Sequence, residues 1–499
     1  MSITQRFWLT LAAALVVVIV VLALVGTPPI PAQPNPPTTT TAGPTPSIQT
    51  TPGADTSGAD GIGDPYLTKA GAGGYDVQHY DIKVRAEISG SIRGRTTITA
   101  VATQDLDSFN LDLELAASAV RVNGAPARLA QKAGQLTVQA ERVQPDSPAI
   151  SKGATFAVEV DYGGNAGGVA TGQIPSFYRA DNEFVIAGEP ESATLWFPAN
   201  DHPRDAATVQ AEINVPKGTE AISAGRLQTR GADPAEASRD RWVWQVDSPT
   251  VTYATFLAVG QYSVQQGMAG GRPFTYVVSD ALGETRKQEA FSWLRETPKS
   301  ITKLENYLGP YPFSGFGGFV PAVSFYWGGL EIAMMPVYNN RVVGSERLLD
   351  HEIAHMWLGD TVTLHEWNDI FINESLVSYA TWLTVSGSNA ESNFTTAYNG
   401  QANEADFWRP ALSDPGVEHM FERVYDRGPL VVHALRNRMG DKAFFAMLKK
   451  WAQQRGPRSL EDFRTMADRA TSENLTKFFA EWLDQTDRPE PTADNGVTR

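Results

Sequence analysis

The stretch that decides the fold reads SERLLDHEIAHMWLG and runs from Ser345 to Gly359. Ser345 can cap the start of a helix, and Gly359 can end it. On that helix His351 and His355 are four residues apart, so both imidazoles project from one face. Two neutral imidazoles about 2.0–2.1 Å from a metal ion suit zinc. Glu352 lies about 100° around the helix, where it can reach a metal-bound water without binding the metal.

A third ligand candidate follows in the next segment of the chain. Eighteen residues separate Glu374 from His355. The surrounding apolar residues recur at helical spacing, which places Glu374 on a second helix that can pack across the first. Two histidines and one glutamate leave the fourth tetrahedral position open, as in a catalytic zinc site. The pattern therefore predicts one Zn²⁺ ion held by His351, His355 and Glu374, with Glu352 as the general base.

The composition excludes several other kinds of chemistry. The chain has 499 residues and no cysteine, which removes disulfides, thiol nucleophiles and cysteine-ligated metal sites. Asp and Glu total 56 against 41 Lys and Arg, a formal net charge of −15. An acidic chain of this size is a poor candidate for nucleic-acid binding. The length allows about three domains.

The N-terminal segment predicts contact with a membrane. Residues 8–25 carry no charge, follow Arg6 and end before Gly26. Spanning a bilayer takes about 20 apolar residues, whereas the apolar region of a signal peptide has about 7–15. We therefore expect residues 1–26 to be a membrane anchor or, alternatively, a cleaved signal peptide. Either places the catalytic domain outside the cytoplasm, at the cell membrane or secreted.

Two regions of different composition follow. Residues 27–65 are rich in Pro and Thr, have almost no large apolar side chain and predict an extended linker. Beyond it, Tyr80, Ile82 and Val84 alternate with charged residues at a period of two. Such runs, separated by turn signals, predict a β-rich domain over 66–265.

The spacing of the metal motif resembles that of the aminopeptidase N family of zinc peptidases, which includes leukotriene A hydrolase. Members of that family also carry a Trp-Phe-Gly-Asn-like run after the second histidine, which here reads Met356-Trp357-Leu358-Gly359-Asp360. The resemblance covers about 66–490. It implies a multidomain α+β fold with a saddle-like β domain followed by a mainly helical, thermolysin-like catalytic domain over 266–490. We expect residues 491–499 to be a flexible tail.

The same resemblance implies how a substrate would bind. Gly328, Gly329 and Glu331 lie where the family has Gly-Ala-Met-Glu-Asn, so Glu331 would bind the free amino group and the glycines would line the substrate. Ile332 replaces the family's asparagine, which removes a polar contact to the substrate backbone. Glu189, twelve residues before Asp201, corresponds to the family's second carboxylate for the amino group.

Tyr425 completes the set of candidate site residues. The run Tyr425-Asp426-Arg427-Gly428 matches the family's Tyr-x-Lys-Gly, which implies a phenol that donates to the tetrahedral oxyanion.

The resemblance implies a zinc aminopeptidase, attached to the membrane through residues 8–25 or secreted, that acts on peptides with a free N-terminus. Two alternatives remain open from the residues alone. One is an endopeptidase or a hydrolase of non-peptide substrates at the same metal. The other is a non-catalytic, envelope-binding protein. The sequence does not indicate the oligomeric state.

Overall fold

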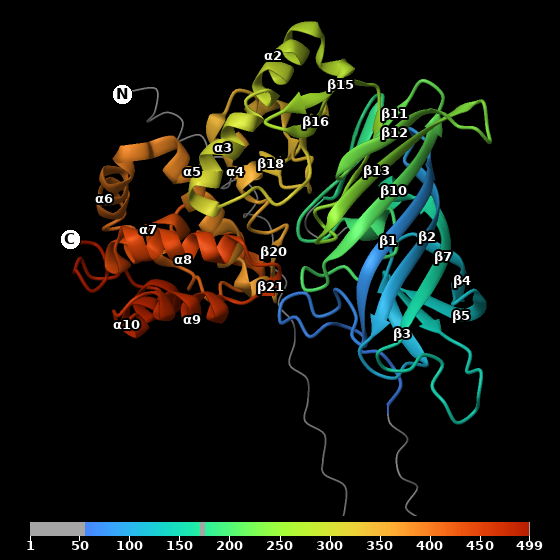
Figure 1. Cartoon of the computed structure of the whole chain (residues 1–499), viewed down its shortest axis with the longest axis horizontal. Coiled ribbons are helices and arrows are strands. Elements are labelled where there is room, and N and C mark those ends of the chain that lie inside the picture. The colour runs from blue at the N-terminus through green and yellow to red at the C-terminus, as the bar shows by residue number, and fades with distance from the viewer. Residues whose placement is uncertain (1–54, 170–174, 499) are drawn as a thin grey trace, which may run out of the picture. The chain divides into compact units, whose positions relative to one another are not determined.

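The computed structural model describes residues 55–169 and 175–498. Figure 1 shows that the strands come first along the chain and most helices follow, so the architecture has the predicted α+β order. The predicted N-terminal anchor and most of the predicted linker lie outside the described residues. No helix within the described ranges has the length and hydropathy needed to cross a bilayer.

The N-terminal part is β-rich, as predicted, and contains two sheets. In β1 (Tyr75–Ala86), the side chains of Tyr80, Ile82 and Val84 are buried while the charged residues between them face outward. This alternation gives the larger sheet one apolar face. The ten-stranded sheet has the order β12 (Arg226–Ala232), β13 (Arg239–Thr250), β10 (Ala207–Pro216), β1, β2 (Ser91–Ala102), β7 (Thr155–Asn165), β4 (Ala116–Val122), β5 (Ala125–Lys132), β6 (Gln135–Gln139) and β3 (Ser108–Asp112). The four-stranded sheet has the order β11 (Glu220–Ser223), β14 (Leu257–Gly260), β9 (Glu183–Ile186) and β8 (Phe177–Ala180).

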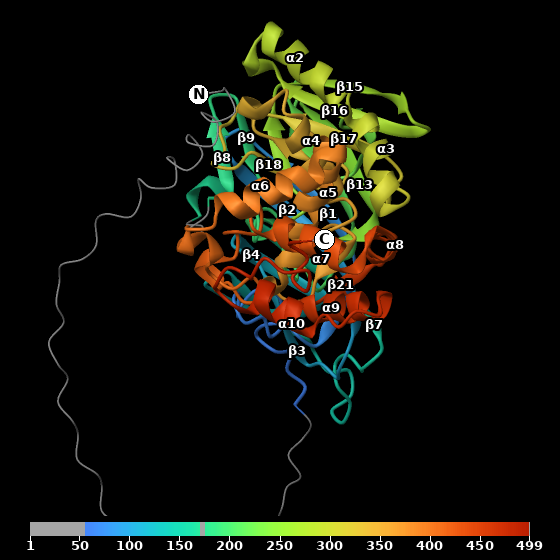
Figure 2. The same cartoon turned by 90° about the vertical axis from the view of Figure 1, so that its left-hand side faces the viewer.

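The C-terminal part, which the sequence predicts to be the catalytic part, begins with a five-stranded sheet. Its order is β15 (Tyr262–Ala269), β16 (Arg272–Ser279), β17 (Phe316–Val320), β19 (Val337–Tyr338) and β18 (Gly329–Leu330). The helices are α2 (Glu284–Leu294), α3 (Thr297–Leu308), α4 (Glu346–Ala354), α5 (Leu376–Ser386), α6 (Ala390–Gly400), α7 (Gly428–Met439), α8 (Asp441–Ala452), α9 (Leu460–Ala470) and α10 (Thr476–Phe479). Two short strands, β20 (Val362–Leu364) and β21 (Gly456–Arg458), pair in parallel. Helix α4 packs against α3 and α5, and α5 packs against α7 (Figure 2).

The predicted linker is too long at its C-terminal end, because residues 55–65 already contact the folded part. The side chain of Asp64 is fully buried. Its carboxylate accepts the Trp367 N–H at 2.7 Å and lies 2.9 Å from Nε2 of His202. Since a carboxylate that accepts buried donors holds a segment with almost no large apolar side chain, composition alone did not reveal this contact.

The predicted tail and the predicted domain boundary are also corrected. Asn495 is buried, and its carbonyl oxygen accepts the indole N–H of Trp482 at 3.1 Å, so part of the chain after residue 490 is packed. The boundary placed between residues 265 and 266 falls inside β15, whose strand pairs with β16 of the catalytic part. An alternating strand pattern carries no information about which sheet the strand joins.

Candidate metal centre

Helix α4 carries both histidines and begins as predicted. The Ser345 hydroxyl accepts the Leu348 N–H at 3.2 Å, which caps the helix. The helix ends at Ala354, earlier than the glycine predicted to end it. Gly359 follows in a turn with φ of +117°, and a Cβ there would lie 2.6 Å from Oδ1 of Asn373. Backbone conformation and close approach therefore both require glycine at this position.

The three predicted zinc ligands lie together with their donor atoms in a triangle. Nε2 of His351 and Nε2 of His355 are 3.3 Å apart, and each is 3.4 Å from Oε2 of Glu374. The edge of a regular tetrahedron is about 1.63 times its centre-to-vertex distance, so atoms about 2.0–2.1 Å from a zinc ion lie roughly 3.3–3.4 Å apart. Oε2 of Glu374 is buried without a hydrogen-bond partner among the described residues. The donor set therefore fits one tetrahedral zinc ion with an open fourth position.

Glu374 reaches this position from an irregular turn. The segment Phe371–Ser375 is a π-helical turn that leads into α5, where the sequence predicted an ordinary helix. Single π turns inside α-helices often occur at functional sites. This turn places two consecutive side chains, Asn373 and Glu374, within reach of His355.

The imidazole of His355 is oriented by its other nitrogen. Nδ1 lies 2.9 Å from Oδ1 of Asn373 and 3.0 Å from the Leu358 carbonyl oxygen. Both partners are acceptors, so Nδ1 carries the proton and Nε2 keeps its lone pair for the metal. The Asn373 amide donates to the hydroxyl of Tyr253 at 3.4 Å, and that hydroxyl donates to Oε1 of Glu331 at 3.0 Å.

Neither of these two supporting residues was predicted from the sequence. Asn373 stands next to Glu374, and this position beside a metal ligand is the one local signal for its role. Tyr253 is 120 residues away from Asn373 in the chain, and no local pattern marks it. The structure thus places a residue of the β-rich N-terminal part next to the support of the metal ligand.

The predicted general base is buried beside the ligands. Glu352 is 3% exposed. Burial, followed by the charges of Glu331 and Glu374, raises the pKa of its carboxyl well above the ordinary value, while His355 opposes this effect. A Cβ on Gly329 would lie 2.3 Å from Oε1 of Glu352, so strand β18 leaves room for the carboxylate only because residue 329 has no side chain.

The two glycines predicted to line the substrate therefore differ in how closely the site packs against them. A Cβ on Gly328 would first meet Leu348 at 3.4 Å, which is an ordinary contact. Close packing against the site explains Gly329 and does not explain Gly328.

Three carboxylates come together next to the metal ligands. Oxygens of Glu189, Glu331 and Glu374 all lie within 4.8 Å of one another. Glu189 belongs to the N-terminal part, and its Oε1 is buried with no hydrogen-bond partner among the described residues. Burial first, and then the charges of Glu331 and Glu374, raise the pKa of Glu189 well above its ordinary value. A positively charged group bound here would relieve this repulsion.

Tyr425 lies at the open side of the ligand triangle. Its hydroxyl donates to Oε1 of Glu374 at 3.0 Å, and its ring centroid is 6.1 Å from that of His351. The residue is 38% exposed. Burial of the hydroxyl and the nearby carboxylates, Glu374 first among them, raise the pKa of Tyr425 well above 10. The phenol therefore stays protonated and can act as a donor.

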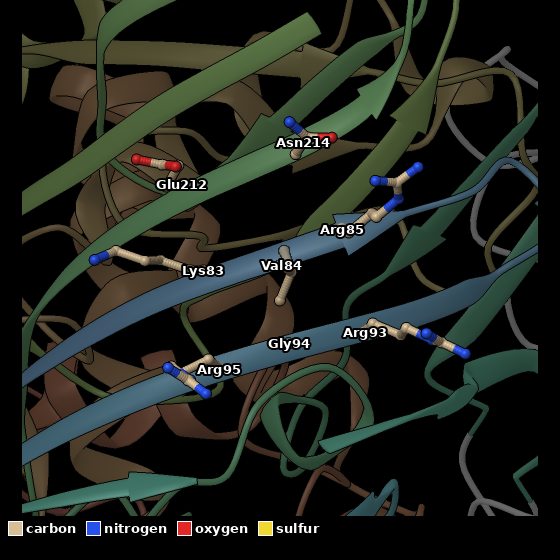
Figure 3. A pocket seen from close by; sticks show the side chains of 8 residues that line it. All are labelled: Lys83, Val84, Arg85, Arg93, Gly94, Arg95, Glu212 and Asn214. Atoms are coloured by element: carbon tan, nitrogen blue, oxygen red, sulfur yellow. The ribbon is translucent and has the colours of Figure 1, made fainter. Parts of the chain in front are cut away.

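A second group of charged side chains lies on the large sheet, away from these residues. Figure 3 shows a pocket of about 290 Å³ whose side chains come from β1, β2 and β10. Three of its cations are paired at 2.5–3.1 Å, namely Lys83 with Asp81, Arg85 with Glu236 and Arg95 with Asp161. Arg93 has no ion pair among the described residues. None of the lining residues belongs to the metal centre, and the paired charges are those of a solvated sheet face.

Comparisons with known proteins agree with this geometry. Residues 337–482 match the peptidase family M1 domain. The chain is 26% identical to aminopeptidase N of Acetobacter pasteurianus, over 60% of this chain and 88% of that protein. It is 23% identical to leukotriene A-4 hydrolase of Xenopus laevis, over 61% and 51%, and to tricorn protease-interacting factor F2 of Thermoplasma acidophilum, over 70% and 45%. The chain thus spans about half the length of these last two relatives.

A solved structure extends the similarity over most of the chain. It is a mutant M1 zinc metallopeptidase from Deinococcus radiodurans bound to a Tyr-Ser-Ala substrate. The two chains are 25% identical with a TM-score of 0.75, and the match covers 87% of this chain and all of the other.

Proposed function

We propose that this chain, which belongs to peptidase family M1, is a zinc-dependent aminopeptidase that removes N-terminal residues from peptides. The observation that carries the proposal is the group of carboxylates beside the ligand triangle. Oxygens of Glu189, Glu331 and Glu374 lie within 4.8 Å of one another, and two of these residues are not needed for the metal. Negative charge concentrated in this way suits the ammonium group of a peptide N-terminus.

In the proposed mechanism, His351, His355 and Glu374 hold the zinc ion. Zinc bound there would polarise the scissile carbonyl and acidify the attacking water. Glu352 would accept a proton from the attacking water and return it to the leaving amine.

The remaining side chains orient the substrate and stabilise charge. Glu331 and Glu189 would hold the ammonium and so position the first peptide bond in the site. Tyr425 donates its hydroxyl to the oxygen on which negative charge develops. The hydroxyl of Tyr253 keeps Glu331 in place by donating to Oε1.

One experiment separates this function from its alternatives. A peptide with a free N-terminus and its N-acetylated counterpart are incubated with the purified enzyme, with and without a chelator. We expect chelator-sensitive cleavage of the free peptide only. Equal cleavage of both peptides would indicate an endopeptidase or another zinc hydrolase, and no cleavage of either would favour a binding protein.

A variant of Glu331, one of the two carboxylates proposed to bind the substrate ammonium, tests the same function. We expect Glu331→Ala to lower kcat/KM for the free peptide by at least ~10-fold, since a charge-assisted hydrogen bond contributes roughly 1.5–3 kcal/mol. The acetylated peptide has no ammonium to lose, so its slow cleavage serves as the control.

Attachment to the membrane is a separate part of the proposal. The support is the sequence of residues 8–25, which is uncharged and long enough to span a bilayer. The catalytic domain would then face the outside of the cell. N-terminal sequencing of the mature protein decides between the two forms, because a start within residues 26–34 would indicate a cleaved signal peptide.

A further inference from the structure

Arg347, a cation near the metal centre, has no ion-pair partner among the described residues. Arg347 lies on α4, four residues before His351, so the two side chains share a helix face and their Cα atoms are about 6 Å apart along the axis. Arg347 is exposed and makes no hydrogen bond or ion pair with any described residue. The acidic side chains on either side of Arg347 in α4 already have partners. Glu346 pairs with Lys303, and Asp350 accepts the Thr384 hydroxyl at 2.6 Å.

Arg347 as a residue is exposed to solvent, but its guanidinium is partly surrounded by protein atoms, and this burial lowers the pKa of Arg347. A partly desolvated cation without an anion is unfavourable, so an anionic ligand beside it would be stabilised.

The metal centre has a closed acidic end and an open end. Oε1 of Glu331 lies 3.9 Å from Nδ1 of His355, so the amine anchors are on the His355 side. The side chain of His355 is 1% exposed, whereas that of His351 is 13% exposed. A peptide held by its ammonium at the acidic end therefore leaves the metal past His351, in the direction of Arg347.

A short peptide carries a carboxylate at a limited distance from its ammonium. An extended residue advances about 3.3–3.6 Å, so the carboxylate of a dipeptide or tripeptide lies roughly 7–10 Å from its ammonium. We propose that Arg347 binds the C-terminal carboxylate of the substrate, and that the preferred substrates are dipeptides and tripeptides with both termini free. The planar guanidinium offers two parallel N–H donors to a carboxylate, which an exposed lysine would not reproduce. This proposal rests on the proposed aminopeptidase function.

The test compares one tripeptide as its C-terminal acid and as its C-terminal amide. For the wild type we expect kcat/KM to be ~10-fold higher for the acid, which corresponds to about 1.4 kcal/mol. In Arg347→Gln the two values should agree within ~2-fold, with cleavage of the amide unchanged, because only the carboxylate contact is lost. Arg347→Lys should keep part of the preference.

A matched control comes from the N-terminal sheet. Arg93 is also an exposed arginine without an ion pair among the described residues, and it lies on β2 (Figure 3). Arg93→Gln should therefore keep the full preference for the acid. An acid preference that survives in Arg347→Gln, or that is absent from the wild type, would overturn the proposal.

The outcome can be told apart from failure of the aminopeptidase function. That function is tested at the other end of the peptide, by N-acetylation. An enzyme that rejects acetylated peptides but treats acid and amide alike remains an aminopeptidase and has no carboxylate subsite at Arg347.

Discussion

Replacing Gly329 by alanine is expected to displace the general base while leaving the metal ligands in place. The new Cβ would lie 2.3 Å from Oε1, 2.6 Å from Cδ and 2.7 Å from Cγ of Glu352, whereas real Cβ contacts essentially never fall below 3.0 Å. The carboxylate must therefore retreat by at least 0.7 Å, and by about 1 Å for an unstrained contact. The backbone at Gly329 does not have positive φ, so alanine itself is tolerated there.

A displacement of about 1 Å in a catalytic group can lower the rate ~100-fold. We therefore expect kcat of Gly329→Ala to fall by about two orders of magnitude, equivalent to roughly 2.7 kcal/mol in the barrier. Zinc content should stay at one ion per chain, because Glu352 moves as a flexible side chain and none of the three ligands does. The assay is steady-state turnover of a free-amine peptide, with metal analysis and a thermal unfolding curve on the same sample.

The neighbouring glycine provides the control. A Cβ on Gly328 makes only an ordinary 3.4 Å contact with Leu348, so Gly328→Ala should keep kcat within ~3-fold of the wild type. The reasoning is refuted if Gly329→Ala keeps near-normal turnover with zinc bound, or if both substitutions impair turnover equally.

The remaining predictions concern the ligands, the oxyanion donor and the buried carboxylate of the N-terminal segment. His351→Ala or His355→Ala should lose zinc and activity together, as metal analysis would show, because two remaining ligands bind weakly; full zinc occupancy in either variant would contradict the ligand set. Tyr425→Phe should lower kcat by about 10²–10³ with a smaller effect on KM, since one oxyanion donor is lost; an effect on KM alone would assign the tyrosine to substrate binding. For Asp64, burial alone would raise the pKa, but hydrogen bonds from His202 and three backbone N–H groups lower it to about 2. A depressed pKa stabilises the folded state above the unfolded value near 3.8 and loses this effect as pH falls towards 2, so Asp64→Ala should cost roughly 2 kcal/mol more at pH 6 than at pH 2. Denaturant unfolding of both proteins across this pH range measures the difference in their free energies of unfolding. A difference that grows as the pH falls would contradict the lowered pKa of Asp64.

The sequence predicted the parts of the structure that depend on local spacing. The four-residue interval between His351 and His355 and the cap at Ser345 are properties of a single helix, so they follow from the chain alone. The eighteen-residue gap to Glu374 was informative because two packed helices can bridge it in few ways.

What the sequence did not predict depends on contacts between distant segments. No particular amino-acid composition marks the π turn at Phe371–Ser375, so it could not be told from an ordinary helix. The hydrogen bond from Tyr253 to Glu331 joins two parts of the fold that are far apart in the sequence. The burial of Asp64 likewise needs His202 and Trp367 as partners. Periodicity reports which face of an element is apolar, but it does not report which distant donor a polar side chain meets.

Contacts within the local motif serve metal binding, whereas contacts between distant segments serve substrate recognition. All three zinc ligands fall within residues 351–374, and among the described residues the β-rich part contributes to the metal centre only through Tyr253, which supports Asn373 behind His355. Recognition of the ammonium is different, because Glu189 and Tyr253 come from the N-terminal part while Glu331 follows β18. Changes at the contacts between the parts, such as Asp64 with Trp367, should therefore weaken selectivity for a free amine before they weaken zinc binding. In the proposed function, selectivity for a free amine thus depends on residues of both parts, whereas the three zinc ligands come from one.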